Sequence, residues 1–186
     1  MPDIVSGIRA EFVRYRALAD AAIAQVPDAQ LGVADGDGGN SIAIICAHVS
    51  GNLTSRFTDF LTADGEKPWR KREEEFAAQA VTRDALMAKW SDGWAVLTAT
   101  IDSLTDADLS RTVTIRQQPL TVLEALLRSL AHVSYHVGQI VHIGKVLRGR
   151  EWQYLSIPPG QSDAYNKNPS FESAEGHAAK LKSTRS

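Results

Sequence analysis

The sequence predicts an all-α protein built as a four-helix bundle. Four long segments repeat apolar residues at spacings of three and four, the period of an amphipathic helix. A single short segment alternates polar and apolar residues as a strand does. No internal repeat, heptad array or linker divides the 186 residues, so we predict one helical domain over residues 1–168 and a C-terminal tail over residues 169–186.

The first two predicted helices cover residues 4–26 and 41–61. The first ends before Pro27, because proline has no backbone N–H to continue a helix. The second follows a glycine-rich turn, where Asn40 and Ser41 offer side-chain oxygens that can cap the new helix.

A third helix is predicted over residues 82–101, with Thr82 as its N-cap. Before it, residues 63–72 contain a glycine, a proline and mixed charges, so they predict a long polar connection at one end of the bundle. The four tryptophans are predicted to anchor the core and the segment that follows the last helix, because large rings contribute most where they are buried. They are Trp69, Trp90, Trp94 and Trp152.

The C-terminal half begins with a short extended or hairpin insert. Residues 112–115 alternate polar with apolar and Pro119 follows, which is typical of such an insert. The longest periodic segment, residues 121–147, predicts the fourth helix, and Gly149 comes just after its end. Residues 156–168 lack an apolar period and are predicted to form a packed strap, beyond which the tail is predicted to be frayed.

Charge and composition exclude several classes of protein. The 20 Lys and Arg nearly balance the 22 Asp and Glu, so the composition provides no excess of positive charge that would bind the phosphate backbone of nucleic acid. No stretch approaches the roughly 20 apolar residues of a membrane span, and the N-terminus lacks the pattern of a signal peptide. Cys46 is the single cysteine, so no internal disulfide is possible. We therefore predict a cytoplasmic protein that is not inserted in a membrane.

Three of the five histidines form a candidate metal site. His132 and His136 are four residues apart on the last predicted helix, so their side chains lie within roughly 40° of each other and can chelate one ion. A third ligand is expected from a facing helix, and His48 is the candidate. His142 is rotated about 120° from His136 and is not expected to be a ligand. Cys46 is turned about 160° from His48 and is interpreted as a small buried hydrophobe.

Polar residues near these histidines are predicted to line a pocket or to support the ligands. His48 shares an unusually polar stripe of its helix with several of them. Gln139 falls on the metal-binding face of the last helix, where it can bond a water ligand, and the preceding Gly138 would admit close helix packing. The predicted pocket and supporting residues are Asn52, Ser55, Arg56, Asp59 and Gln139.

Three imidazoles suit Zn, Ni, Cu or Fe(II), with zinc or nickel favoured here, and they leave coordination positions open for water or substrate. The alternative, on spacing alone, is a pair of histidines that are simply hydrogen-bonded. His132 is followed by Val133 rather than by glutamate, so the zincin motif with its built-in general base is absent.

The segment from His132 to Ile140 carries two histidines four apart followed by a Gly-Gln pair, and it resembles the helix signature of the DinB-like superfamily. More narrowly, residues 40–44, 51–61, 64–68 and 159–166 resemble an uncharacterised bacterial subfamily of DinB-like domains. The likeness covers about residues 1–168.

This resemblance implies an up-down-down-up four-helix bundle in which His48, His132 and His136 converge on a metal ion. It also implies a homodimer, with water in the open coordination positions. Some relatives are thiol-dependent transferases or isomerases that use bacillithiol, mycothiol or glutathione, so a low-molecular-weight thiol and a small-molecule substrate are expected partners.

Charged residues gather at the end of the second predicted helix and in the connection after it. The ordinary role of such residues is solvated surface charge. For the cations the alternative is the binding of an anionic group, such as a carboxylate of a thiol cofactor. The residues concerned are Arg56, Asp59, Lys67, Arg70 and Arg72, with Glu66, Glu73, Glu74 and Glu75 among them.

Two functions follow from the candidate site. The first is an enzyme in which the metal lowers the pKa of a bound thiol or water for group transfer or hydrolysis, although no general base is identifiable. The second is a non-catalytic metal-binding or stress-response interaction module, in which the three histidines stabilise the bundle.

Overall fold

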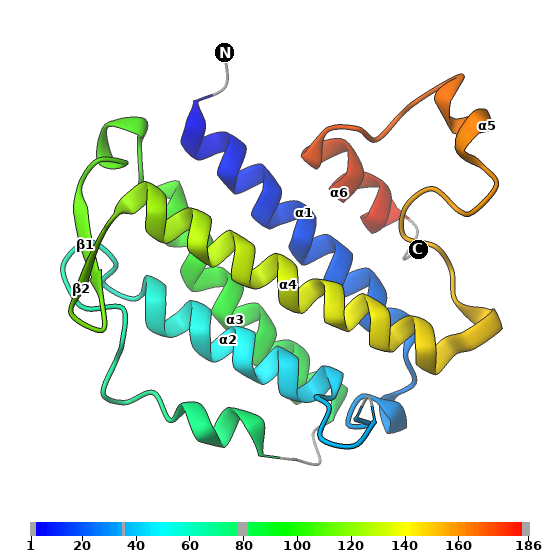
Figure 1. Ribbon diagram of the computed structural model, residues 1–186, viewed down its shortest axis with the longest axis horizontal. Coiled ribbons are helices and arrows are strands. Elements are labelled where there is room, and N and C mark those ends of the chain that lie inside the picture. Colours follow the sequence, from blue (N-terminus) through cyan, green and yellow to red (C-terminus); the bar gives the residue numbers. More distant parts are fainter. Residues whose placement is uncertain (1–2, 35, 78–81, 184–186) are drawn as a thin grey trace.

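The computed structural model describes residues 3–34, 36–77 and 82–183, and this part of the chain is mostly helical (Figure 1). Its secondary structure agrees with the predicted all-α class, apart from one small two-stranded sheet. None of its helices is both long and apolar enough to cross a membrane. The α-helices are α1 (Ile4–Gln25), α2 (Ile42–Phe57), α3 (Arg83–Asp102), α4 (Val122–Arg148), α5 (Ser162–Asn166) and α6 (Ala174–Ser183).

Each of the four long helices begins after a residue whose side-chain oxygen accepts a hydrogen bond from a backbone N–H of the first turn. Thr121 forms a full capping box, because the Glu124 carboxylate accepts the Thr121 backbone N–H at 2.7 Å in return. The caps are Asp3, Ser41, Thr82 and Thr121. These local signals explain why the starts of the helices lie within a residue of their predicted positions.

Helix α2 is shorter than predicted. It ends at Phe57 rather than at Leu61, and Asp59 then adopts a positive φ of 50°, which an α-helix does not accommodate. The apolar residues Phe60 and Leu61 continue the helical period but pack on the core from a turn.

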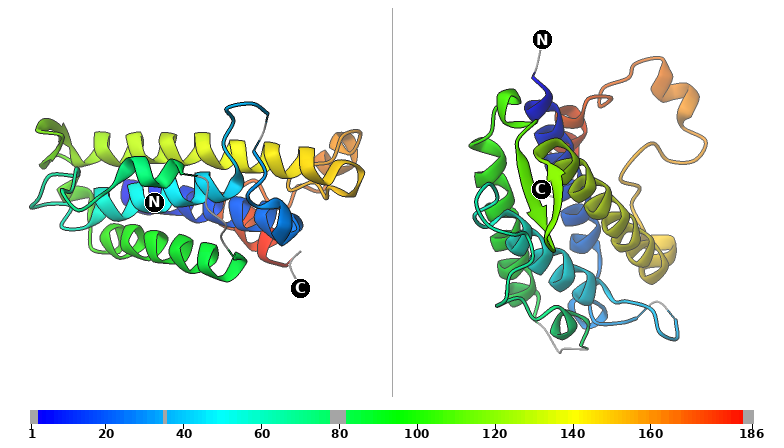
Figure 2. Two further views of the ribbon diagram at one scale, coloured as in Figure 1. Left: turned by 90° about the horizontal axis from the view of Figure 1, so that it is seen from below. Right: turned by 60° about the vertical axis from the view of Figure 1, so that its left-hand side comes forward.

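The long helices pack in pairs, α1 against α4 and α2 against α3, and α4 also contacts α2. Seen from below, α1 and α2 lie between α4 on one side and α3 on the other (Figure 2). Trp90, fully buried on α3, donates its indole N–H to Asp20 of α1 at 2.8 Å. Trp94 and Trp152 are buried as predicted, whereas Trp69 is 54% exposed, so the prediction that it anchors the core is wrong.

Helices α2 and α3 approach closely because glycine and serine meet at their crossing. A Cβ on Gly93 would lie 2.8 Å from the Cα of Ser50 and 2.9 Å from its carbonyl oxygen. Only a residue without a side chain fits there at this separation of the helices. Position 93 therefore sets the distance between α3 and α2, the helix that carries His48.

A hairpin of β1 (Thr112–Ile115) and β2 (Gln118–Thr121) leads into α4, which confirms the predicted insert. It stands at the end of the helices where α4 begins (Figure 2). Its turn residues, Arg116 and Gln117, have positive φ values of 53° and 62°. This matches a two-residue hairpin turn, but neither residue is the glycine or asparagine that such a turn favours.

Asp64, in the connection after α2, holds this turn from outside the hairpin. Its carboxylate accepts the backbone N–H groups of Arg116 at 2.8 Å and Gln117 at 2.7 Å, and also that of Glu66 at 2.7 Å. The hydrogen bonds from Glu66 first, and then from the turn, lower the pKa of Asp64 to about 2. Asp64 thus offsets the backbone strain and fixes the position of Arg116.

We predict that Asp64→Asn destabilises the protein at neutral pH and that the difference from wild type shrinks in acid. The pKa of Asp64 is lower in the folded chain than the ordinary 3.8, so its stabilisation is present above about pH 4 and is lost as the pH falls towards 2. Urea unfolding of both proteins between pH 6 and pH 2 measures this. A difference in unfolding free energy that does not change with pH would contradict the role of the charge.

Two segments depart from their predicted arrangement. The connection after α2 includes the 3₁₀ helix η2 (Arg72–Phe76), which packs against α2 instead of lying at one end of the helices. Near the C-terminus, α6 packs on α1 and buries Ala178 and Leu181, so the prediction of a frayed tail is wrong for this segment. The strap over residues 156–168 is largely exposed rather than packed, and α5 stands away from the long helices (Figure 1).

Candidate metal centre

The packing of α4 on α2 brings the three predicted ligand histidines together. His48, His132 and His136 each present a nitrogen, and these atoms lie within 4.8 Å of one another. The Nε2 atoms of His48 and His132 are 3.2 Å apart, although 84 residues separate them in sequence. The rings of His132 and His136, one helical turn apart, have centroids 4.6 Å apart. Within the described residues no other group of this kind is found.

Hydrogen bonds on the far nitrogens orient two of these rings. His48 donates its Nδ1–H to Glu75 at 2.9 Å, and His136 donates its Nδ1–H to Gln139 at 2.8 Å. In both rings this leaves Nε2 without a proton, the form that binds a metal. His132 differs, because its Nδ1 is buried and has no hydrogen-bond partner among the described residues.

Glu75 connects the histidine site to a buried ion pair. Arg70 donates from Nε and Nη2 to the two oxygens of Glu75, each at 2.8 Å, and its side chain is only 3% exposed. Burial raises the pKa of Glu75, but the hydrogen bonds from Arg70 and His48 outweigh this and hold it below its usual value. The expectation of solvated surface charge is therefore wrong for Arg70 and Glu75.

Glycine at position 51 makes room for this carboxylate beside α2. A Cβ there would lie 2.1 Å from Oε1 of Glu75, so any side chain would displace the group that orients His48. The next residue of η2, Phe76, lies against the His48 ring with centroids 4.8 Å apart. His48 is therefore held by both a hydrogen bond and a ring contact from η2.

The paired histidines of α4 are neutral at pH 7. Burial, followed by the charges of His136 and His48, lowers the pKa of His132 to about 3. Burial also lowers the pKa of His136, against the opposing effect of its hydrogen bond with Gln139. Neutral imidazoles are the metal-binding form, so both rings can accept an ion without first losing a proton.

The spacing of two of these nitrogens suits a tetrahedral ion. Two imidazole nitrogens bound to zinc at roughly 2.0–2.1 Å stand about 3.3 Å apart in a tetrahedral arrangement. The 3.2 Å between Nε2 of His48 and Nε2 of His132 is close to that distance. The residues present therefore fit a three-histidine ligand set.

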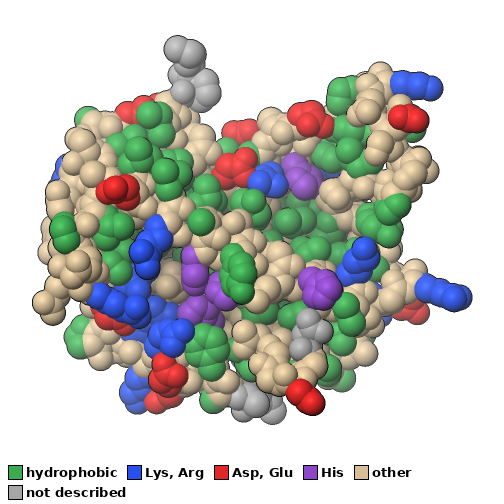
Figure 3. All heavy atoms as spheres, in the orientation of Figure 1, with side chains coloured by type: hydrophobic (Ala, Val, Ile, Leu, Met, Phe, Trp, Pro, Cys, Tyr) green, Lys and Arg blue, Asp and Glu red, His purple; other side chains and the backbone are tan. Residues whose placement is uncertain are grey.

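A cavity of about 180 Å³ opens beside two of these histidines and is strongly basic. In Figure 3 the purple histidine side chains left of the centre adjoin a group of blue Lys and Arg side chains. Asn52 and Arg56, both predicted to line a pocket, are among its walls. The lining consists of His48, Asn52, Arg56, Arg70, Arg72, Ile115, Arg116, Arg128, Ser129 and His132.

The other predicted supporting residues lie elsewhere. Ser55 is fully buried and donates its hydroxyl to the carbonyl of Gly65 at 2.8 Å, which ties the connection to α2. Asp59 is exposed in the turn after α2 and does not line the cavity. Gln139 bonds His136, a candidate ligand, directly, whereas we expected it to bond a water ligand.

His142, Cys46 and Gly138 make no contribution to the ligand set. His142 is exposed on α4 and lies outside the histidine group. Cys46 is buried in the core, and burial raises the pKa of its thiol far above the usual value, so it is not available as a nucleophile. Gly138 is exposed, and a Cβ at this position would meet no atom within 4 Å, so the expected close helix packing there is wrong.

Comparison with protein families gives one result that covers most of the chain. The family DUF1572, described as a protein of unknown function, matches residues 2–161. The chain belongs to this family. The matched region includes all three histidines as well as Glu75 and its partner Arg70. The comparisons with curated proteins and with solved structures found no match for this DUF1572 chain.

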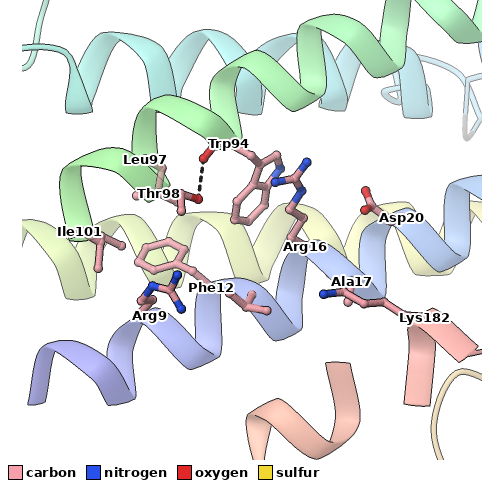
Figure 4. Close-up of a pocket in the computed structure, with 11 residues that line it drawn as sticks. Arg9, Phe12, Arg16, Ala17, Asp20, Trp94, Leu97, Thr98, Ile101 and Lys182 are labelled. Carbon is pink, nitrogen blue, oxygen red and sulfur yellow. Dashed lines mark hydrogen bonds between the residues drawn. The ribbon is translucent and has the colours of Figure 1, made fainter. Parts of the chain in front are cut away.

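A second cavity of this DUF1572 chain, about 340 Å³ in volume, lies between α1 and α3. Figure 4 shows the apolar side chains of Phe12, Trp94, Leu97 and Ile101 in its wall, with Arg9, Arg16 and Lys182 also around it. Its lining contains no histidine or cysteine, and Asp20 is its one carboxylate among the described residues. This cavity offers apolar contact but no cluster of metal-binding groups, so the candidate site for chemistry lies at the histidines.

Proposed function

We propose that this chain is a divalent-metal-binding protein in which His48, His132 and His136 hold a zinc or nickel ion. The observation that carries the proposal is the convergence of three imidazole nitrogens within 4.8 Å on two packed helices. The hydrogen bonds from His48 to Glu75 and from His136 to Gln139 support it, because ligand histidines in proteins almost always donate their other N–H in this way.

We further propose that the fold is the up-down-down-up four-helix bundle of DinB-like proteins. The chain directions in Figure 1 support this, because α1 and α4 run one way while α2 and α3 run the other. The histidine spacing and the Gly-Gln pair of α4 support it independently. The homodimer that the same resemblance implies stays a prediction.

We infer a metal-dependent enzyme of the thiol transferase or hydrolase type. The bound ion would supply a lowered pKa for a thiol or water held in an open coordination position. In this chain His48 and His132 line an open cavity rather than a closed site, which favours an enzyme over a structural metal module. The burial of Cys46 favours a nucleophile that arrives with the substrate or cofactor.

Metal content tests this proposal. Wild-type protein, purified without chelator or metal-affinity tag, is expected to contain about one zinc or nickel ion per chain, and His132→Ala is expected to lose it. His142→Ala removes an exposed histidine of the same helix and serves as the control that keeps its metal. Elemental analysis of the three proteins measures this. Equal metal in wild type and His132→Ala, or no metal after reconstitution with both ions, refutes the site.

Turnover separates an enzyme from a binding module. Metal-loaded wild type is expected to accelerate thiol conjugation or hydrolysis relative to His136→Ala at the same metal concentration. If wild type retains metal, melts at a lower temperature after chelation and shows no rate above that of the variant, the ion is structural.

A further inference from the structure

The basic cavity beside the histidines gathers five arginines from separate parts of the chain. Arg56 comes from α2, Arg70 and Arg72 from the connection and η2, Arg116 from the hairpin turn, and Arg128 from α4. No carboxylate side chain of the described residues is part of its lining. Because guanidinium groups repel one another, such a concentration needs compensating anions.

Two carboxylates pair with three of these five guanidinium groups. Arg56 and Arg116 share Glu66, at 3.3 Å and 2.9 Å. Arg70 forms a buried, bidentate ion pair with Glu75.

Of the two remaining arginines, one is weakly paired and the other has no ionic partner among the described residues. The partner of Arg72 is Glu73, whose side chain is 88% exposed, so that pair is weak. Arg128 makes no hydrogen bond or ion pair with the residues that the structure describes. The cavity therefore keeps an excess of positive charge.

Two of the arginines, Arg56 and Arg116, are also held in place. The side chain of Arg56 is 11% exposed and donates to the carbonyl of Gly65 at 2.5 Å. Burial lowers the pKa of Arg56, and repulsion from Arg70 and Arg116 adds to this against the attraction of Glu66. The backbone of Arg116 is fixed by the strained turn, whose N–H groups Asp64 accepts, and its guanidinium pairs with Glu66. Donors held in this way lose little freedom when a ligand binds.

We propose that this cavity binds the anionic group, a carboxylate or a phosphate, of a small-molecule substrate whose reacting end faces His48 and His132. Planar guanidinium groups match the oxygens of both anions. At about 180 Å³ the cavity is smaller than the 300–1,000 Å³ typical of whole-ligand sites, so it suits one small charged group. Asn52 and Ser129 add polar side chains to its wall. Binding of the anion is independent of the metal, whereas the reaction that would follow rests on the proposed function.

Calorimetric titration tests the cavity on chelator-treated, metal-free protein. Inorganic phosphate and acetate are titrated separately at a fixed ionic strength of about 0.15 M. Saturable binding of one of them is expected, and the one that binds more tightly identifies the preferred group. Arg128→Gln is expected to weaken that binding about 10-fold, because it removes a charge-assisted donor. Arg150→Gln, which removes an exposed arginine outside the cavity, is expected to have no effect.

The outcomes distinguish this inference from the metal proposal. Anion binding by the metal-free protein that weakens in Arg128→Gln and not in Arg150→Gln supports the cavity even if the protein holds no metal. Absence of binding by either anion, an equal loss in Arg128→Gln and Arg150→Gln, or binding that requires added zinc would each overturn it. Circular dichroism of both variants verifies that the fold is retained.

Discussion

Glu75→Ala is expected to weaken metal binding about 10- to 100-fold and to lower the free energy of unfolding by about 3–5 kcal/mol. The first effect follows because His48 would lose the carboxylate that accepts its Nδ1–H and sets its ring orientation. The second follows because Arg70, whose side chain is 3% exposed, would keep its charge without a partner. Zinc affinity measured by chelator competition and urea unfolding of the metal-free protein report the two effects separately.

Two further variants control this prediction. Glu74→Ala removes the neighbouring carboxylate, which is 68% exposed and, among the described residues, pairs only with an exposed lysine. We expect this substitution to change the free energy of unfolding by less than about 0.5 kcal/mol. Glu75→Gln keeps an acceptor for His48 but removes the charge, so it should lose more stability than metal affinity. If Glu75→Ala behaves like Glu74→Ala in both measurements, Glu75 neither orients His48 nor balances Arg70.

Gly93→Ala is expected to destabilise the protein, even though alanine favours a helix over glycine by about 1 kcal/mol. The added Cβ would lie 2.8 Å from the Cα of Ser50, which is backbone and cannot rotate away, so α2 and α3 must separate. Overpacking of this kind costs about 1–3 kcal/mol and occasionally more. Because α2 carries His48, we also expect weaker zinc binding from the shifted helix.

Gly138→Ala provides the matched control for this substitution. It makes the same change inside a helix, but no atom lies within 4 Å of the new Cβ. We expect it to be neutral or to stabilise the protein by up to about 1 kcal/mol. Urea unfolding of both variants gives the comparison, and the same sign for the two changes would show that the α2–α3 contact does not constrain position 93.

The helices and the pairing of two candidate ligand histidines could be predicted from the sequence alone. Caps such as Thr82 and Thr121, and the apolar period of each segment, act within a few residues, so they are visible in the sequence. The pairing of His132 with His136 is equally local, because one helical turn puts both on one face. The hairpin also follows from local alternation. The apolar period does not predict the early end of α2, because Phe60 and Leu61 continue this period although they pack on the core from a turn.

The surroundings of the histidines depend on tertiary packing and could not be predicted from the sequence. In the sequence, nothing distinguishes Glu75 from the exposed glutamates Glu73 and Glu74. The packing of η2 on α2 nevertheless places it against His48, 27 residues away. The five arginines of the cavity likewise come from distant segments. Ion pairs and cavities of this kind depend on which surfaces meet when the helices pack, and that information is not contained in the spacing of residues along one helix.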